Sequence, residues 1–191
     1  MEKEYYPFDN LPKLETERLL LRKVAYTDRS DIYTYAHLPE VAQFVKFEPH
    51  TSDFESLEFI NIVMEMYNKR KPAPWAIEFK EDKKMIGTIG FHNWNMEHFS
   101  AELGFVLSPL YWNMGITTEA LKRIIKFVFE ETNINRIEAK CEPENSASSR
   151  VMEKAGFTYE GTLRDELRIK GKFRDYRHYS ILRREYLGKD D

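Results

Sequence analysis

Cysteine is almost absent from this sequence of 191 residues, which contains only Cys141. A single cysteine cannot form an intramolecular disulfide, and it leaves no basis for a cysteine-rich metal site. None of the five histidines has a neighbour at a spacing typical of metal ligands. We therefore expect no metal and no structural disulfide, as is usual for proteins of a reducing compartment.

Long apolar runs and an excess of positive charge are also missing. No apolar run approaches the length of a membrane span, and the first ten residues do not have the pattern of a signal peptide. The net charge of -3 predicts no basic face for nucleic acid. We expect a cytoplasmic protein that binds neither membrane nor nucleic acid and exists as a monomer or a homodimer. Its length fits one domain.

Short apolar runs alternate with segments of helical periodicity along the chain. The expected strands are 17–24, 75–79, 85–91, 100–107, 136–141, 157–163 and 176–182. The expected helices are 28–38, 54–69, a segment that begins after Gly115, and 146–155. Pro39 is expected to end the first helix and Gly156 the last. Residues 81–84 and 93–98 have the composition of turns, so the three middle strands should form an antiparallel meander. The pattern predicts an α/β (α+β) sandwich with a mixed, mostly antiparallel sheet of about seven strands and about four helices.

The loop 111–118 joins a strand to the most strongly periodic helix. The start of a helix offers free backbone N–H groups and the positive end of the helix dipole, which favour a phosphate. Gly115 would let the backbone approach an anion closely, and Thr117 and Thr118 would add hydroxyl donors or cap the helix. A single glycine before a helix is more often an ordinary turn. The loop matches neither the phosphate loop of nucleotide hydrolases nor the dinucleotide fingerprint.

Three stretches together resemble the GNAT acetyltransferase superfamily, in particular the branch of the ribosomal-protein N-terminal alanine and serine acetyltransferases. They are residues 101–121, residues 145–157 and residues 14–22. The resemblance spans residues 14–185 and predicts the domain there, with an N-terminal extension at 1–13 and a C-terminal tail at 186–191.

The resemblance implies that acetyl-CoA binds between two splayed central strands, with its pyrophosphate on the loop before the central helix. The residues implied in cofactor binding are Phe105, Val106, Leu107, Asn113, Met114, Gly115, Ile116, Thr117, Thr118 and Asn145. The sequence departs from the family pattern at Asn113, where many relatives carry glycine, and at Thr117, where glycine or alanine is usual. Asn tolerates unusual backbone conformations, and the backbone N–H of Thr117 remains available.

Acetyl transfer to an amine needs a base for the ammonium, donors for the oxyanion, and an acid or donor for the departing thiolate. Glu102 is the first candidate for the base because it precedes the expected cofactor strand segment by a few residues, where a carboxylate could face the acceptor amine directly or through water. An exposed strand glutamate is the plain alternative. Ser148 lies where the branch carries a serine proposed to protonate the thiolate. Tyr159 and Tyr176 are alternative acids. Cys141 is expected to be a buried structural thiol rather than a nucleophile.

Two further candidates for the acceptor side are weaker. Glu78 is expected at the surface, and a lone histidine such as His92 is more often structural. Aromatic residues with the potential to line an acceptor cleft, or to belong to the core, are Tyr5, Tyr6, Phe8, Phe44, Phe47, Trp75 and Trp94. By resemblance, the first two helices and the loop 44–52 should border that cleft, and Lys46, Glu48 and His50 in the loop do not identify a substrate.

The leading hypothesis is an N-acetyltransferase that moves acetyl from acetyl-CoA to a primary amine by direct attack in a ternary complex. Its expected acceptor is a protein N-terminus, with ribosomal proteins as one option. A small amine such as a polyamine or an antibiotic is an alternative acceptor. A non-catalytic acyl-CoA-binding regulatory module is an alternative of another class. A nucleotide-dependent ligase or kinase is disfavoured, since no phosphate-loop lysine is present.

Overall fold

The computed structural model describes residues 5–188. Residues 1–4 of the expected N-terminal extension and 189–191 of the expected tail lie outside this range. The strands are β1 (Leu14–Glu15), β2 (Leu19–Lys23), β3 (Pro74–Phe79), β4 (Lys84–Asn95), β5 (Ser100–Leu107), β6 (Arg136–Cys141), β7 (Thr158–Ile169) and β8 (Lys172–Leu182). The helices are α1 (Arg29–Ala36), α2 (Pro39–Ala42), α3 (Asp53–Asn68), α4 (Ile116–Glu131), α5 (Ser146–Ala155) and α6 (Arg183–Leu187).

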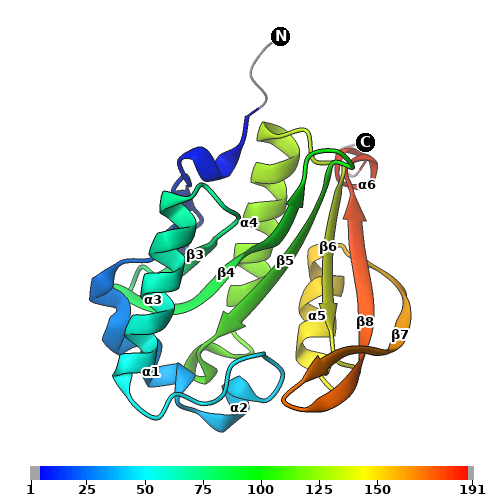
Figure 1. The fold of residues 1–191 in the computed structure, drawn as a ribbon. Coiled ribbons are helices and arrows are strands. Elements are labelled where there is room, and N and C mark those ends of the chain that lie inside the picture. Colours follow the sequence, from blue (N-terminus) through cyan, green and yellow to red (C-terminus); the bar gives the residue numbers. More distant parts are fainter. Residues whose placement is uncertain (1–4, 189–191) are drawn as a thin grey trace.

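One sheet organises the described residues, with the strand order β1-β2-β3-β4-β5-β6-β8-β7. Every neighbouring pair is antiparallel except β5 and β6, which run parallel. Helices α1 and α3 cover one face of the sheet, and α4 and α5 cover the other (Figure 1). The expected α/β class and the antiparallel meander of β3, β4 and β5 are confirmed. The described residues form eight strands and six α-helices, whereas about seven strands and about four helices were expected. The difference arises because β1, α2 and α6 are short elements with no periodic signal.

Several predicted boundaries were wrong in detail. The first helix ends at Ala36, and Pro39 begins the short helix α2 instead of ending α1, because its fixed φ suits the first helical turn. Strand β4 continues to Asn95 through residues expected to form a turn. The hairpin strands β7 and β8 also extend well beyond their predicted ends, up to a tight turn at Lys170 and Gly171. Both extensions are rich in polar residues. Pairing with a neighbouring strand, rather than an apolar pattern of their own, holds them in strand conformation.

The predicted end of α5 is confirmed. Gly156 has φ 98°, the left-handed conformation that glycine adopts at a helix end without a steric penalty. Helix α4 buries the expected stripe of Leu121, Ile124, Ile125 and Val128 against the sheet. These two helices therefore fix the position of the loop 112–115 and of the segment 142–148 relative to the strands.

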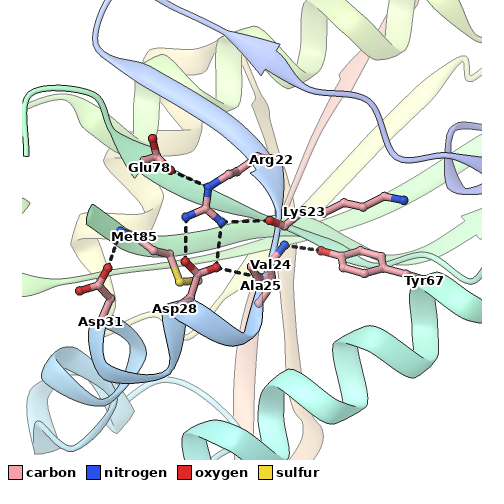
Figure 2. Close-up of polar contacts among 9 residues, drawn as sticks. All are labelled: Arg22, Lys23, Val24, Ala25, Asp28, Asp31, Tyr67, Glu78 and Met85. Carbon is pink, nitrogen blue, oxygen red and sulfur yellow. Dashed lines mark hydrogen bonds and ion pairs between the residues drawn. The ribbon is translucent and has the colours of Figure 1, made fainter. Parts of the chain in front are cut away.

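A buried ion-pair cluster fastens α1 to the sheet (Figure 2). The Arg22 guanidinium on β2 donates to both carboxylate oxygens of Asp28 at 2.7 and 2.8 Å, and its Nε donates to Glu78 on β3 at 2.6 Å. Asp28 is 3% exposed and also accepts the backbone N–H of Ala25 at 2.8 Å. Nearby, the Tyr67 hydroxyl of α3 accepts the N–H of Val24 at 3.0 Å. The cluster holds α1 and α3 at a fixed place on their face of the sheet.

The parallel strands β5 and β6 pair over only three residues. Their register joins Ser100 to Arg136, Ala101 to Ile137 and Glu102 to Glu138. Beyond Glu102 the two strands diverge, as Figure 1 shows. From Leu103 to Leu107, β5 is paired with β4 alone among the described strands. The sheet therefore opens next to Glu102.

Candidate functional site

A cleft of about 780 Å³ passes through the opening between β5 and β6. Its lining includes residues 102–106 of β5 and residues 139–141 of β6. On one face of the sheet it is bordered by α1, the loop 44–50 and α3, and on the other by Asn145 and Ser148 of the α5 start. The volume falls in the usual range for small-molecule sites. Two molecules approaching from opposite faces of the sheet can therefore meet at the end of the β5–β6 pairing.

Glu102 lies at this meeting point and takes part in a chain of charged groups. Its Oε1 is 3.4 Å from the Nζ of Lys140 on β6, and the same Nζ lies 3.0 Å from Oε1 of Glu166 on β7. Glu166 in turn contacts His178 Nε2 at 2.6 Å. Burial alone would lower the pKa of Lys140, but the two carboxylates raise it above its ordinary value. Lys140 therefore stays protonated at neutral pH and holds the Glu102 side chain beside the cleft.

His92 also faces the cleft. It occupies a β-bulge, since Phe91 pairs with Leu103 and Asn93 with Glu102, which leaves His92 without a partner on β5. Its ring lies over Gly104, where an added Cβ would come within 2.3 Å of His92 Nε2. Desolvation in the concave cleft lowers the pKa of His92 despite the opposing effect of Glu102. The imidazole is therefore mainly neutral at pH 7 and can accept a proton. The structure thus places His92 in the lining of the cleft, and whether it contacts substrate stays a prediction.

The loop before α4 has the backbone expected of an anion site. Asn113 and Gly115 adopt φ of 61° and 75°, and Gly115 is the N-cap of α4. The first backbone bond at this helix end runs from Glu119 N to Gly115 O at 3.0 Å. The N–H groups of residues 116–118 therefore lie ahead of the helical hydrogen-bond ladder. Of the two roles expected for Thr117 and Thr118, capping was wrong, because both lie inside the first turn and Gly115 is the N-cap of α4, with no side-chain cap. Their role as hydroxyl donors stays a prediction.

Arg18 and Glu119 fasten this loop to the first strands, a contact that the sequence analysis missed. The Arg18 Nη1 donates to the Met114 carbonyl at 3.0 Å, and its Nε donates to Glu119 at 2.7 Å. The Thr16 hydroxyl donates to the other Glu119 oxygen at 2.5 Å. Burial opposes ionisation of Glu119, but the hydrogen bonds from Thr16 and Arg18 outweigh it and lower its pKa. The partners are about a hundred residues apart, so no local sequence pattern joins them.

Asn145 and Ser148 meet the cleft where α5 begins. Asn145 is the N-cap of α5, and its Oδ1 accepts the backbone N–H of Ser148 at 3.1 Å. Both residues line the cleft, together with Phe105 and Val106, whereas Leu107 and residues 113–118 do not. The Leu107 carbonyl accepts the indole N–H of Trp112 at 2.9 Å, which links the end of β5 to the loop. Cys141 lines the cleft but is 4% exposed, so its expected burial is confirmed.

Some of the other candidate residues line the cleft, and the rest make structural contacts elsewhere. Tyr176 lines the cleft, whereas Tyr159 is half exposed elsewhere and contacts Thr162. Glu78 is bound by Arg22 and is therefore structural. The loop 44–50 borders the cleft as expected, including Lys46, Glu48 and His50. Of the seven aromatic residues, two line the cleft, namely Phe44 and Phe47. The other five take the alternative expected for them and pack in or against the core, namely Tyr5, Tyr6, Phe8, Trp75 and Trp94.

Residues 5–188 contain neither a membrane-spanning helix nor a group of metal-ligating side chains. None of the helices there combines the length and the apolar character needed to cross a membrane. Within the same range, no three His, Cys, Asp or Glu side chains are grouped so as to hold a metal ion.

Comparisons with known proteins agree with this geometry. Residues 18–158 match the family model of the acetyltransferase (GNAT) domain. The chain is 35% identical to the uncharacterized N-acetyltransferase p20 of Bacillus licheniformis, over 92% of this chain and 98% of the relative. It is 27% identical to the ribosomal protein uS5 alanine N-acetyltransferase of Escherichia coli, over 87% of this chain and 90% of the relative. A GNAT-family acetyltransferase from Bacillus anthracis superposes with a TM-score of 0.80 at 30% identity, covering 90% of this chain and 99% of that structure. The chain therefore belongs to the GNAT family of N-acetyltransferases.

Proposed function

We propose that the protein transfers acetyl from acetyl-CoA to the α-amino group of a peptide or protein N-terminus, with Glu102 as the base. One observation carries the proposal: a single cleft crosses the sheet at the point where β5 and β6 part, and Glu102 lines it there. The relative that is named as a uS5 alanine acetyltransferase supports a protein N-terminus as the acceptor class. A ribosomal protein is one member of that class.

The cofactor side of the site would use backbone groups. The β5 edge from Leu103 onward has no strand partner on the β6 side among the described residues, so the N–H and C=O groups of Phe105 to Leu107 can pair with the pantetheine arm. The N–H groups of residues 116–118 and the positive end of α4 suit the pyrophosphate. Asn145 already uses its Oδ1 to cap α5, so its contact with the cofactor would come from its amide nitrogen.

The remaining roles follow from what the side chains can do with a proton. An α-amino group titrates near ~8, far below a lysine side chain, so it is mostly protonated at pH 7 but needs less help to lose its proton than a lysine would. Glu102 accepts that proton, directly or through water, while Lys140 keeps the carboxylate turned toward the cleft. The Glu102 carboxylate lies close enough to His92 to influence the pKa of the imidazole. His92 is therefore a second acceptor for the same proton. Ser148 would donate to the departing thiolate.

The test compares Glu102→Gln with a matched control, Glu138→Gln. Glu138 is the register partner of Glu102 on β6, but it faces Arg136 and does not line the cleft. With acetyl-CoA and a peptide mixture, free-thiol release and peptide mass report turnover. Loss of a general base should lower kcat about 10²- to 10⁴-fold, with acetyl-CoA affinity by calorimetry unchanged. Glu138→Gln should retain wild-type kcat.

Three results would contradict the proposal in different ways. Full activity of Glu102→Gln would show that Glu102 is not the general base. Turnover of small amines without any peptide product removes the N-terminal acceptor. Tight binding of acetyl-CoA with no turnover of any amine favours a non-catalytic acyl-CoA-binding module.

A further inference from the structure

The acceptor side of the cleft has a charged end and an apolar wall. Glu102, Lys140 and His92 stand at the charged end, beside the opening of the sheet. The wall is formed by α3, where Phe59, Ile62 and Met66 all line the cleft. These residues are three and four positions apart, so they lie on one face of the helix. Ile62 is 54% exposed, which leaves an apolar side chain open to solvent in a concave site.

The side opposite α3 is also apolar. Phe44 and Phe47 line it from the loop after α2, and Leu167 lines it from β7. Lys170, in the turn of the β7–β8 hairpin, donates to the Ala42 carbonyl at 2.8 Å and lies 3.4 Å from Glu48. This contact joins the hairpin to the loop, so the two elements that form the side opposite α3 are held to each other. The apolar space between this side and α3 is part of the cleft.

The acidic groups along this wall are mostly engaged. Lys170 neutralises Glu48, and Glu55 accepts the backbone N–H groups of Thr51 and Ser52 at 2.7 and 2.8 Å. Glu58 lines the cleft as an exposed carboxylate.

The remaining titratable groups do not make the wall acidic. Lys46, also exposed, brings a positive charge to the same lining. His50 contacts Ser56 at 2.9 Å, and burial lowers its pKa, so it is mainly neutral at pH 7. A second ammonium that packed against the phenylalanine, isoleucine and methionine side chains would lose part of its hydration, and this loss is costly. Glu58 is an exposed carboxylate of the lining that could offset part of that cost.

We propose that the acceptor carries its primary amine on an apolar or aromatic body, such as a peptide whose first residue is leucine or phenylalanine. The amine lies at Glu102 and the apolar side chain packs against Phe59, Ile62 and Phe47. The inference rests on the proposed function, since it assigns the acceptor class for the same reaction. It predicts that a polyamine is acetylated less efficiently than such a peptide.

The first experiment varies the acceptor alone. The tripeptide amides Gly-Gly-Gly, Leu-Gly-Gly and Phe-Gly-Gly share one backbone, and spermidine is the polycationic comparison. Because a single methylene in an apolar pocket is worth about 10-fold or more in kcat/KM, the leucine and phenylalanine peptides should exceed triglycine amide by at least about 10-fold. Spermidine should fall below both.

The second experiment varies the wall. Ile62→Ser removes apolar surface from the cleft, while Phe54→Ser changes an apolar residue of the same helix that is 57% exposed and does not line the cleft. Serine and isoleucine have similar helix propensities, so folding is little affected. Ile62→Ser should lower kcat/KM for the leucine peptide about 5-fold or more, with triglycine amide within about 2-fold. Phe54→Ser should change neither.

The outcomes separate the two proposals. Preference for triglycine amide or spermidine, or equal losses on all peptides in Ile62→Ser, overturns the apolar acceptor while the enzyme remains an N-acetyltransferase. If no amine is acetylated, the proposed function fails, and the acceptor inference fails with it.

Discussion

Replacement of Arg22 by methionine tests whether the buried ion-pair cluster holds α1 in place. Methionine keeps much of the length and apolar contact of the arginine stem. It removes two hydrogen bonds to Asp28 and one to Glu78. Asp28, 3% exposed, keeps only the N–H of Ala25 among the hydrogen bonds in this cluster. Its carboxylate becomes a buried charge without a cation.

The expected loss follows from that uncompensated charge. Removing one partner of a buried pair destabilises proteins by about 3–5 kcal/mol, whereas exposed pairs contribute about 0–1 kcal/mol. The control Arg29→Met, on α1, breaks an exposed pair, in which the Arg29 and Asp53 side chains are 38% and 51% exposed. For a chain of this length, each kcal/mol shifts Tm by roughly 2–4 °C, so Arg22→Met should lower Tm by about 6–20 °C and Arg29→Met by no more than about 4 °C.

Urea unfolding and thermal melts at pH 7 provide the measurement. The double variant Arg22→Met/Asp28→Leu removes the stranded charge and should regain most of the lost stability. If Arg22→Met costs no more than Arg29→Met, or if the double variant is less stable than the single one, the stranded-charge reasoning is wrong. Because α1 lines the cleft through Ile32 and Tyr35, Arg22→Met should also raise KM for the acceptor.

Two further predictions concern the loop before α4 and the pH dependence of stability. Gly115→Ala should lose about 1–2 kcal/mol of folding free energy through backbone strain alone, since φ is 75° and an added Cβ would lie 3.8 Å from Arg18 Nη2, an ordinary contact. A thermal melt checks this loss, and an unchanged affinity for CoA by calorimetry would show that the loop is not the pyrophosphate site. The hydrogen bond from Arg136 lowers the pKa of Glu160 from 4.5 to about 2, so the stability that ionised Glu160 provides is present above about pH 4.5 and lost as the pH falls toward 2. Between pH 5 and 3 the Tm of Glu160→Gln should therefore fall less than that of the wild type, and parallel curves would contradict the assignment.

Regular elements could be predicted because their signal is local. The stripe of α4 and the glycine at 156 specify a helix and a helix end within a few residues, and both predictions were confirmed. The ends of β4 and β7 could not be predicted, because polar residues there are held in strand conformation by their partners. Helix α2 was missed since a proline after a helix indicates an end as readily as a new beginning.

The candidate site was predictable only in part, for the same physical reason. Glu102, Asn145 and Ser148 were found by resemblance, and the structure brings all three to one cleft. Whether they act as base, cofactor ligand and acid stays a prediction. The contacts that position them depend on the fold, because Lys140 meets Glu102 and Glu166 only after three strands are assembled. No spacing along the chain indicates such a contact.

Gly104 illustrates how a residue acquires meaning only from its neighbour. In the sequence it is a glycine inside a strand, where glycine weakens pairing and often marks a close approach. In the structure the bulge at His92 turns the imidazole over the β5 backbone, and a Cβ at Gly104 would collide with it at 2.3 Å. The glycine therefore provides the space that lets a neutral imidazole reach the cleft beside Glu102. His92 and Gly104 therefore depend on each other. The bulge that brings them into contact is a property of the β4–β5 register rather than of either residue.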